Sequence, residues 1–166
     1  MLQLASEHYE VGVAPETGGG LTHLRFEGVD VLRPAPRGAK DPLQLACFPL
    51  VPFANRIAQG QFVWEGHTVT LSPNMKSEPH PLHGDGWRES WTVAETSPDR
   101  IVLELRRPAG DWPWAYAVRQ TINAGATGVG VELDLVNLSD AVMPAGLGFH
   151  PYFPGRSRAR LSLIHI

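Results

Sequence analysis

The chain has 166 residues, of which 43% are hydrophobic and 19% charged, and this composition predicts one globular domain over residues 1–166 rather than a disordered chain. Its 15 prolines interrupt nearly every candidate helix, which excludes coiled coils, helical bundles and solenoids. The formal net charge of -3 removes the case for nucleic acid as a partner, because phosphates are bound by clustered Lys and Arg side chains.

The sequence carries no recognisable targeting or membrane signal. The N-terminus MLQLASEHYE has no apolar core and includes Glu7 and Glu10, so it does not read as a signal peptide. No apolar run approaches the roughly 18 residues that a transmembrane helix needs. The single cysteine, Cys47, cannot form an internal disulfide, which favours a reducing compartment. We therefore expect a cytoplasmic protein without a membrane partner, and the sequence leaves its oligomeric state open.

Apolar and polar residues alternate along much of the chain, which is the pattern of half-buried strands. The clearest case is Val129–Leu135, and the pair Phe62–Trp64 and His67–Leu71, joined by Glu65-Gly66, predicts a hairpin. Further strands are expected at Tyr9–Val13, Leu21–Phe26, Ser90–Glu95, Ile101–Leu105 and Ala115–Asn123. Short strands bounded by turn residues predict an all-β fold of antiparallel sheets.

Two long loops, Arg33–Phe53 and Ser72–Arg88, interrupt the strand pattern and contain apolar and aromatic residues, which indicates functional loops. After Pro154, a basic run leads into the apolar ending LSLIHI, whereas an ordinary terminus is polar and frayed. We therefore expect the sheet to be incomplete at the C-terminus, with an exposed edge that favours self-association.

Histidine titrates nearest to neutral pH, so the seven histidines are the first candidates for chemistry. His80 and His83 lie three residues apart and could bind a metal together with His150. However, a proline between the first two prevents a helical face from presenting both, and no second ligand motif exists. A loop with one polar contact and one exposed ring is the better interpretation, and no metal site is predicted.

Three segments combine polar groups with aromatic or apolar residues. In LHGDGW, the face of Trp87 beside polar donors suits a sugar, although a core tryptophan explains the pattern equally well. In GLGFHPYFP, His150 belongs either to a core plug or to a pocket wall. Asn55 and Arg56 follow an apolar run and are expected to be half-buried, so the arginine must bind a polar ligand or pair with a carboxylate.

Four segments, FPLVPFANRIAQGQFVWEG, HPLHGDGW, WPWAY and MPAGLGFHPYFP, occur in this order and together resemble the aldose 1-epimerase (galactose mutarotase-like) family from about Val11 to Pro154. The resemblance implies a large twisted antiparallel β-sandwich and cofactor-free interconversion of the α and β anomers of an aldohexose such as galactose or glucose. The general-acid histidine of that family matches His150, and its substrate-binding arginine and histidine match Arg56 and His83. Asn55 and Trp87 are further candidates for contacting the sugar.

The family's general base is a glutamate, and both it and a substrate-binding aspartate lie beyond the end of this chain. The resemblance therefore implies that these 166 residues are about the N-terminal half of an isomerase and are inactive alone. Two alternatives remain. A non-catalytic carbohydrate-binding or sugar-sensing domain would keep the sugar contacts without an acid, and a hexose-6-phosphate mutarotase would need a cationic pocket built from Arg88, Arg106 or Arg107.

Overall fold

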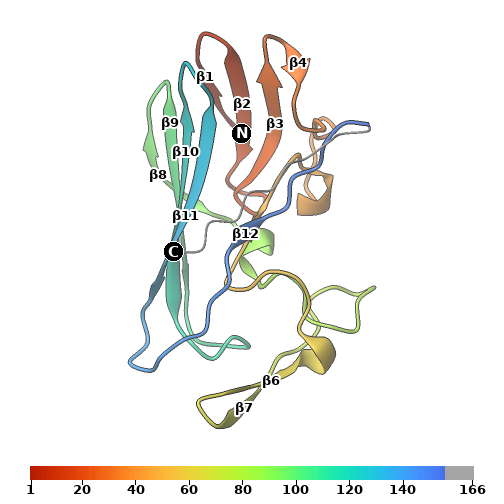
Figure 1. Ribbon diagram of the computed structural model, residues 1–166, viewed down its shortest axis with the longest axis vertical. Helices are drawn as coiled ribbons and strands as arrows, with labels where there is room; N and C mark the ends of the chain where they lie inside the picture. The colour runs from red at the N-terminus through yellow and green to blue at the C-terminus, as the bar shows by residue number, and fades with distance from the viewer. Residues whose placement is uncertain (156–166) are drawn as a thin grey trace.

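A computed structural model describes residues 1–155, and these form a nearly all-β structure of antiparallel strands (Figure 1). The basic run and the apolar ending LSLIHI fall outside the described residues, so the expectation of an uncovered terminus is not tested there. Within residues 1–155, no helix is long and apolar enough to cross a membrane.

The first sheet has four strands in the order β1-β2-β3-β4, so each strand pairs with its neighbour in sequence. Its strands are β1 (Leu2–Ala5), β2 (Tyr9–Ala14), β3 (Gly20–Phe26) and β4 (Val29–Asp30). The predictions for Tyr9–Val13 and Leu21–Phe26 are confirmed, whereas β1 and β4 were not predicted.

The second sheet also has four strands, in the order β11-β10-β9-β8, and contains the longest strands among residues 1–155. Its strands are β8 (Thr92–Thr96), β9 (Arg100–Arg107), β10 (Tyr116–Ala124) and β11 (Val129–Asn137). All four were predicted within a few residues. The register pairs Val118 of β10 with Leu105 on one side and Leu135 on the other, so apolar side chains line up across the sheet.

Two small two-stranded sheets and three short 3₁₀ helices complete the described structure. Strands β6 (Gln61–Trp64) and β7 (His67–Thr70) form the predicted hairpin across Glu65-Gly66. Strand β5 (Pro49–Leu50) pairs with β12 (Gly148–Phe149) and so joins two segments that are far apart in the sequence. The helices are η1 (Pro42–Gln44), η2 (Ala58–Gly60) and η3 (Gly86–Arg88); η1 and η3 lie within the two predicted long loops, and η2 lies between these loops.

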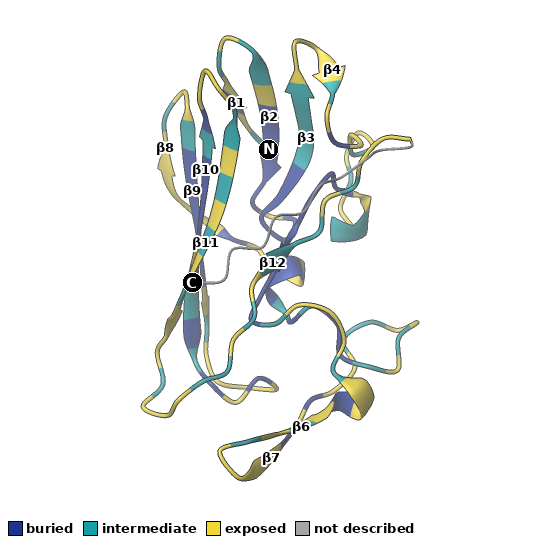
Figure 2. Cartoon of the chain, viewed as in Figure 1, coloured by how far each residue is buried: buried dark blue, intermediate teal, exposed yellow. Residues whose placement is uncertain are grey.

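The two larger sheets pack together as a β-sandwich, with β1 and β2 against β10 (Figure 1). Both contribute to one buried apolar cluster, which includes Val11 and Val13 from β2 and Leu103 and Ile122 from β9 and β10. Strand β11 lies at the sheet edge, and its inward-facing residues are only partly buried (Figure 2). An antiparallel β-sandwich is therefore confirmed, and one of its edges leaves apolar surface incompletely covered.

Candidate functional site

His150 directly follows strand β12, and its imidazole packs on the aromatic ring of Phe48. The backbone N–H of His150 donates to the carbonyl of Phe48 at 3.0 Å, and the two rings stack with centroids 4.9 Å apart. Tyr152 packs on the same imidazole at 4.8 Å. Because Phe48 is buried and His150 is half-buried, the imidazole lies at the boundary between the core and the surface.

The two ring nitrogens of His150 are not equivalent. Nδ1 is buried and has no hydrogen-bond partner among residues 1–155. A nitrogen without access to solvent cannot exchange a proton with a bound molecule, so proton transfer through Nδ1 is excluded in this arrangement.

His83 lies beside His150, with ring centroids 5.4 Å apart and ring planes nearly perpendicular. Its position is fixed by Asn55 through two bonds of 2.9 Å: the N–H of His83 donates to the Asn55 carbonyl, and the N–H of Asn55 donates to Nδ1 of His83. Since Nδ1 accepts a hydrogen bond, the neutral ring must carry its proton on Nε2. The site thus contains a defined N–H donor.

The surroundings of His83 favour its neutral form. Burial first, and then the nearby His150 and Arg56, lower the pKa of His83 from 6.5 to about 4. The hydrogen bond from Asn55 has the same preference, because a protonated ring would place an N–H at Nδ1 facing another N–H. His83 is therefore a neutral imidazole with its proton on Nε2 at neutral pH.

A pH dependence of stability follows from this low pKa. Above pH 6.5 His83 is neutral in both the folded and unfolded states, so it contributes equally to each. Between pH 6.5 and about 4 the unfolded state takes up a proton that the folded state does not, so the free energy of unfolding should fall as the pH is lowered. Denaturant titrations of the full-length protein should show this fall, and a His83→Asn variant should show less of it. An NMR titration midpoint for His83 near 6.5 would contradict the prediction.

The expectation that Asn55 and Arg56 are half-buried is wrong, since both are exposed, the arginine side chain to 47%. A positive φ of 66° at Asn55 turns the chain outward after the apolar run. Arg56 instead pairs with Glu78, to which its Nε donates at 2.7 Å, and this carboxylate raises the pKa of the guanidinium. This bond engages the Nε atom of the guanidinium. Sequence reasoning missed Glu78.

Trp87 is buried, with 2% of its surface exposed. Its indole N–H donates to the carbonyls of Gly84 and Leu82, and its ring stacks on Phe48 with centroids 5.5 Å apart. Of the two interpretations of this residue, the structure therefore places it in the core, behind the phenylalanine that supports His150. Direct stacking of Trp87 on a sugar stays a prediction, and the burial of its ring gives that prediction no support.

The three arginines considered for a phosphate lie in different places. Arg107 is engaged by Asp85 at 2.8 Å and Glu89 at 3.2 Å. Arg88 lies over the ring of Trp87, 5.6 Å from its centroid. Arg106 lines a separate surface cavity over β9–β11. The described residues do not bring these cations together beside His83 and His150.

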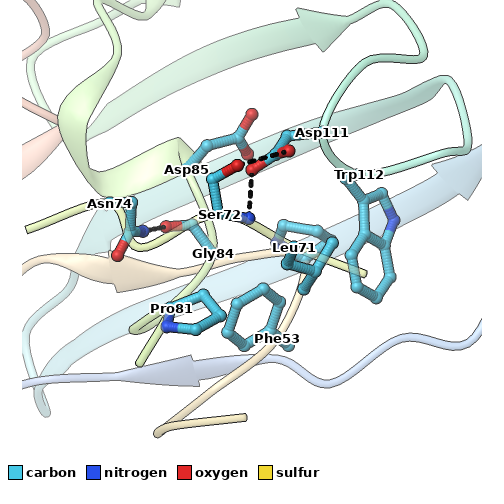
Figure 3. Close-up of a pocket in the computed structure, with 10 residues that line it drawn as sticks. Phe53, Leu71, Ser72, Asn74, Pro81, Gly84, Asp85, Asp111 and Trp112 are labelled. Atoms are coloured by element: carbon cyan, nitrogen blue, oxygen red, sulfur yellow. Dashed lines mark hydrogen bonds between the residues drawn. The ribbon is translucent and has the colours of Figure 1, made fainter. Parts of the chain in front are cut away.

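A cavity of about 60 Å³ is lined in part by Pro81, Gly84 and Asp85 of the His83 loop (Figure 3). It is lined by Phe53, Pro81, Asp85 and Trp112 among others, and by none of the five predicted site residues.

In residues 1–155 no three histidine, cysteine or carboxylate side chains gather as a metal site would require. The Nδ1 atoms of His80 and His83 accept hydrogen bonds from the backbone N–H groups of Gln59 and Asn55.

The two packed antiparallel sheets form a β-sandwich of the galactose mutarotase-like type. The short β5–β12 ladder places His150 beside the loop that carries His83. The profile of the aldose 1-epimerase family matches residues 1–165, and the chain belongs to this family. The resemblance noted from the four sequence segments is thereby confirmed.

Relatives and solved structures agree with this assignment. The chain is 34% identical over 146 residues to the uncharacterized protein YphB of Escherichia coli K12, covering 88% of this chain and 49% of YphB. The uncharacterized protein YihR of the same organism is 29% identical over 154 residues, which is 91% of this chain and 49% of YihR. The chain thus spans about half the length of the curated relatives it matches.

A solved structure from Escherichia coli K12, named as a candidate aldose 1-epimerase, superposes with a TM-score of 0.86 at 34% identity, covering 92% of this chain and 51% of that one. A galactose mutarotase-like protein from Clostridium acetobutylicum superposes with a TM-score of 0.77 at 23% identity, covering 90% and 49%. At 23% identity, the match to the Clostridium acetobutylicum protein shows a similarity of fold alone.

Proposed function

We propose that the full-length protein is an aldose 1-epimerase that interconverts the α and β anomers of a hexose such as galactose or glucose without a cofactor. The observation that carries the proposal is the pair of histidines whose rings lie 5.4 Å apart in unlike surroundings. His83 is kept neutral by burial and by its bond from Asn55, whereas Nδ1 of His150 is buried without a hydrogen-bond partner among residues 1–155, and we assign proton transfer to its Nε2. Neighbouring titratable groups in unlike environments suit a division of labour between proton transfer and hydrogen bonding.

In the proposed reaction, Nε2 of His150 gives a proton to the ring oxygen of the sugar while a carboxylate base takes the proton of the C1 hydroxyl. The bond between C1 and the ring oxygen breaks, the aldehyde rotates, and closure with the roles reversed yields the other anomer. His83 donates a hydrogen bond to a sugar hydroxyl through its Nε2–H. Arg56, oriented by Glu78, contributes further donors.

The base is assigned to the part of the full-length protein that lies outside these 166 residues, because the family's glutamate has no matching motif within them. The chain alone should therefore bind sugar weakly and fail to interconvert anomers. The competing function is a sugar-binding domain, which would use Arg56 and His83 and would need no acid at His150.

Two-dimensional NMR exchange between the anomers of galactose and of glucose tests the proposal. The full-length protein should accelerate the exchange of at least one sugar, and the 166-residue chain should not. A full-length protein that binds either sugar yet leaves its exchange rate unchanged would be a binding domain, and the proposal would be wrong. Competition by glucose-6-phosphate stronger than by glucose would instead indicate a phosphorylated substrate.

A further inference from the structure

The loop that carries His83 is held by two polar contacts that the proposed chemistry does not use. The first is Asn74, whose side-chain N–H₂ donates to the carbonyl of Gly84 at 2.7 Å (Figure 3) and to that of Leu82 at 2.8 Å. Its side-chain oxygen accepts from the N–H of Leu82 at 2.9 Å. Only one orientation of the amide satisfies two carbonyls and one N–H together, so the three bonds define its position. Its partners are the two residues that flank His83.

The second contact is Asp85, whose carboxylate joins the same loop to the second sheet. Arg107 of β9 donates to one oxygen at 2.8 Å, and the hydroxyl of Tyr116 in β10 donates to the other. Tyr116 is only 1% exposed, and burial followed by the charge of Asp85 raises its pKa. A buried hydroxyl that lost this acceptor would carry an uncompensated desolvation cost, so the loop and the sheet are strongly tied together.

Between these contacts the backbone adopts an unusual conformation. His83 has a φ of 61° and Gly84 a φ of 68°. A non-glycine residue in this left-handed region is unfavourable and persists where the surrounding structure fixes it. The conformation of His83 is therefore maintained by its neighbours and not by its own preference.

We propose that Asn74 and Asp85 are positioning residues, which fix the backbone on both sides of His83 so that its Nδ1 meets the N–H of Asn55 and its Nε2–H remains the donor to a sugar. The contact with sugar rests on the proposed function, but the geometry of the His83 ring does not. Neither residue touches the sugar in this arrangement; both act through His83.

Two isosteric variants and one control test the inference in the full-length protein. Asn74→Asp keeps the shape of the side chain and replaces two N–H donors by oxygen facing the carbonyls of Leu82 and Gly84. Tyr116→Phe removes only the hydroxyl that binds Asp85. Arg119→Gln removes an exposed ion pair with Glu104 on the same sheet, where Arg119 donates at 3.0 Å, and leaves the His83 loop untouched.

Nitrogen NMR of His83 reports its tautomer and titration midpoint without any need for catalysis. Asn74→Asp should mix the tautomers of His83, and the tautomer is its deciding readout because the added negative charge raises the midpoint by itself. Tyr116→Phe adds no charge and should raise the midpoint from about 4 and mix the tautomers to a smaller extent, whereas Arg119→Gln should do neither. The KM for sugar should rise about tenfold in Asn74→Asp with a smaller change in kcat, because one donor to the bound sugar is misplaced.

The inference is overturned if folded Asn74→Asp shows the same His83 tautomer as Arg119→Gln, and folded Tyr116→Phe the same tautomer and midpoint. Should Asn74→Asp fail to fold, Asn74→Ala takes its place, because it removes the three bonds to Leu82 and Gly84 without adding a charge, and Tyr116→Phe tests the contact of Asp85. A parent protein without epimerase activity would count against the proposed function only, because the NMR comparison still decides whether Asn74 and Asp85 position His83.

Discussion

Replacing His150 by asparagine should slow anomer interconversion by the full-length protein about 10²–10⁴-fold, the usual contribution of a positioned general acid. Asparagine keeps a polar group at this position but cannot deliver a proton to the ring oxygen. The measurement is two-dimensional NMR exchange of galactose or glucose anomers, with kcat and KM determined separately.

Sugar binding should largely survive this change. His150 stacks on Phe48 and contacts Tyr152, so its loss opens space on one side of the site but leaves His83 and its bond to Asn55 in place. The effect should therefore appear mainly in kcat, as expected for an interaction made in the transition state.

The matched control for this prediction is His67→Asn. His67 is an exposed histidine in the β6–β7 hairpin, paired in register with Trp64, so the same chemical change there should leave the rate unaltered. An His150→Asn protein that keeps its rate within about threefold of the control would show that another group supplies the proton, since loss of a positioned acid costs far more.

Much of the fold was predictable because its longest strands carry a local signal. Strands β9 and β10 and the hairpin β6–β7 show alternation or a turn dipeptide in the sequence, and each was found where expected. The β5–β12 ladder could not be predicted, since each strand has two residues and gains its identity from a partner about a hundred residues away. That ladder is nevertheless what brings His150 onto Phe48.

The site was partly predictable, for a related reason. His83 and His150 were identified from their segments, but their approach to one another depends on long-range packing. Trp87 shows why residue type alone is ambiguous, since a flat ring serves equally in a core or on a surface. Asn74 and Glu78 were missed because each lies in a polar stretch with no periodicity, and their importance comes from the partners that the fold provides.

Gly84→Ala should be the most destabilising single substitution in the His83 loop. The residue has a φ of 68°, and a methyl group on its Cα would overlap the carbonyl oxygen of Val51 and the ring of Pro52. The left-handed conformation alone costs about 1–2 kcal/mol for a residue with a Cβ, and the overlap adds about 1–3 kcal/mol. We expect the free energy of unfolding of the full-length protein to fall by about 3 kcal/mol, measured by denaturant titration.

Gly66→Ala separates the two causes. Gly66 has a φ of 77° in the hairpin turn, but a Cβ there would meet nothing within 4 Å, so this variant carries the conformational cost without the overlap. If both variants lose the same stability, the close approach of Gly84 to Val51 contributes nothing and the prediction is wrong. If Gly84→Ala loses more, the excess measures how tightly the His83 loop is seated against the strand that leads to Asn55 and Arg56. A loop seated so tightly would hold the donor that we propose for sugar binding in place before any sugar arrives, which spares the cost of ordering it on binding.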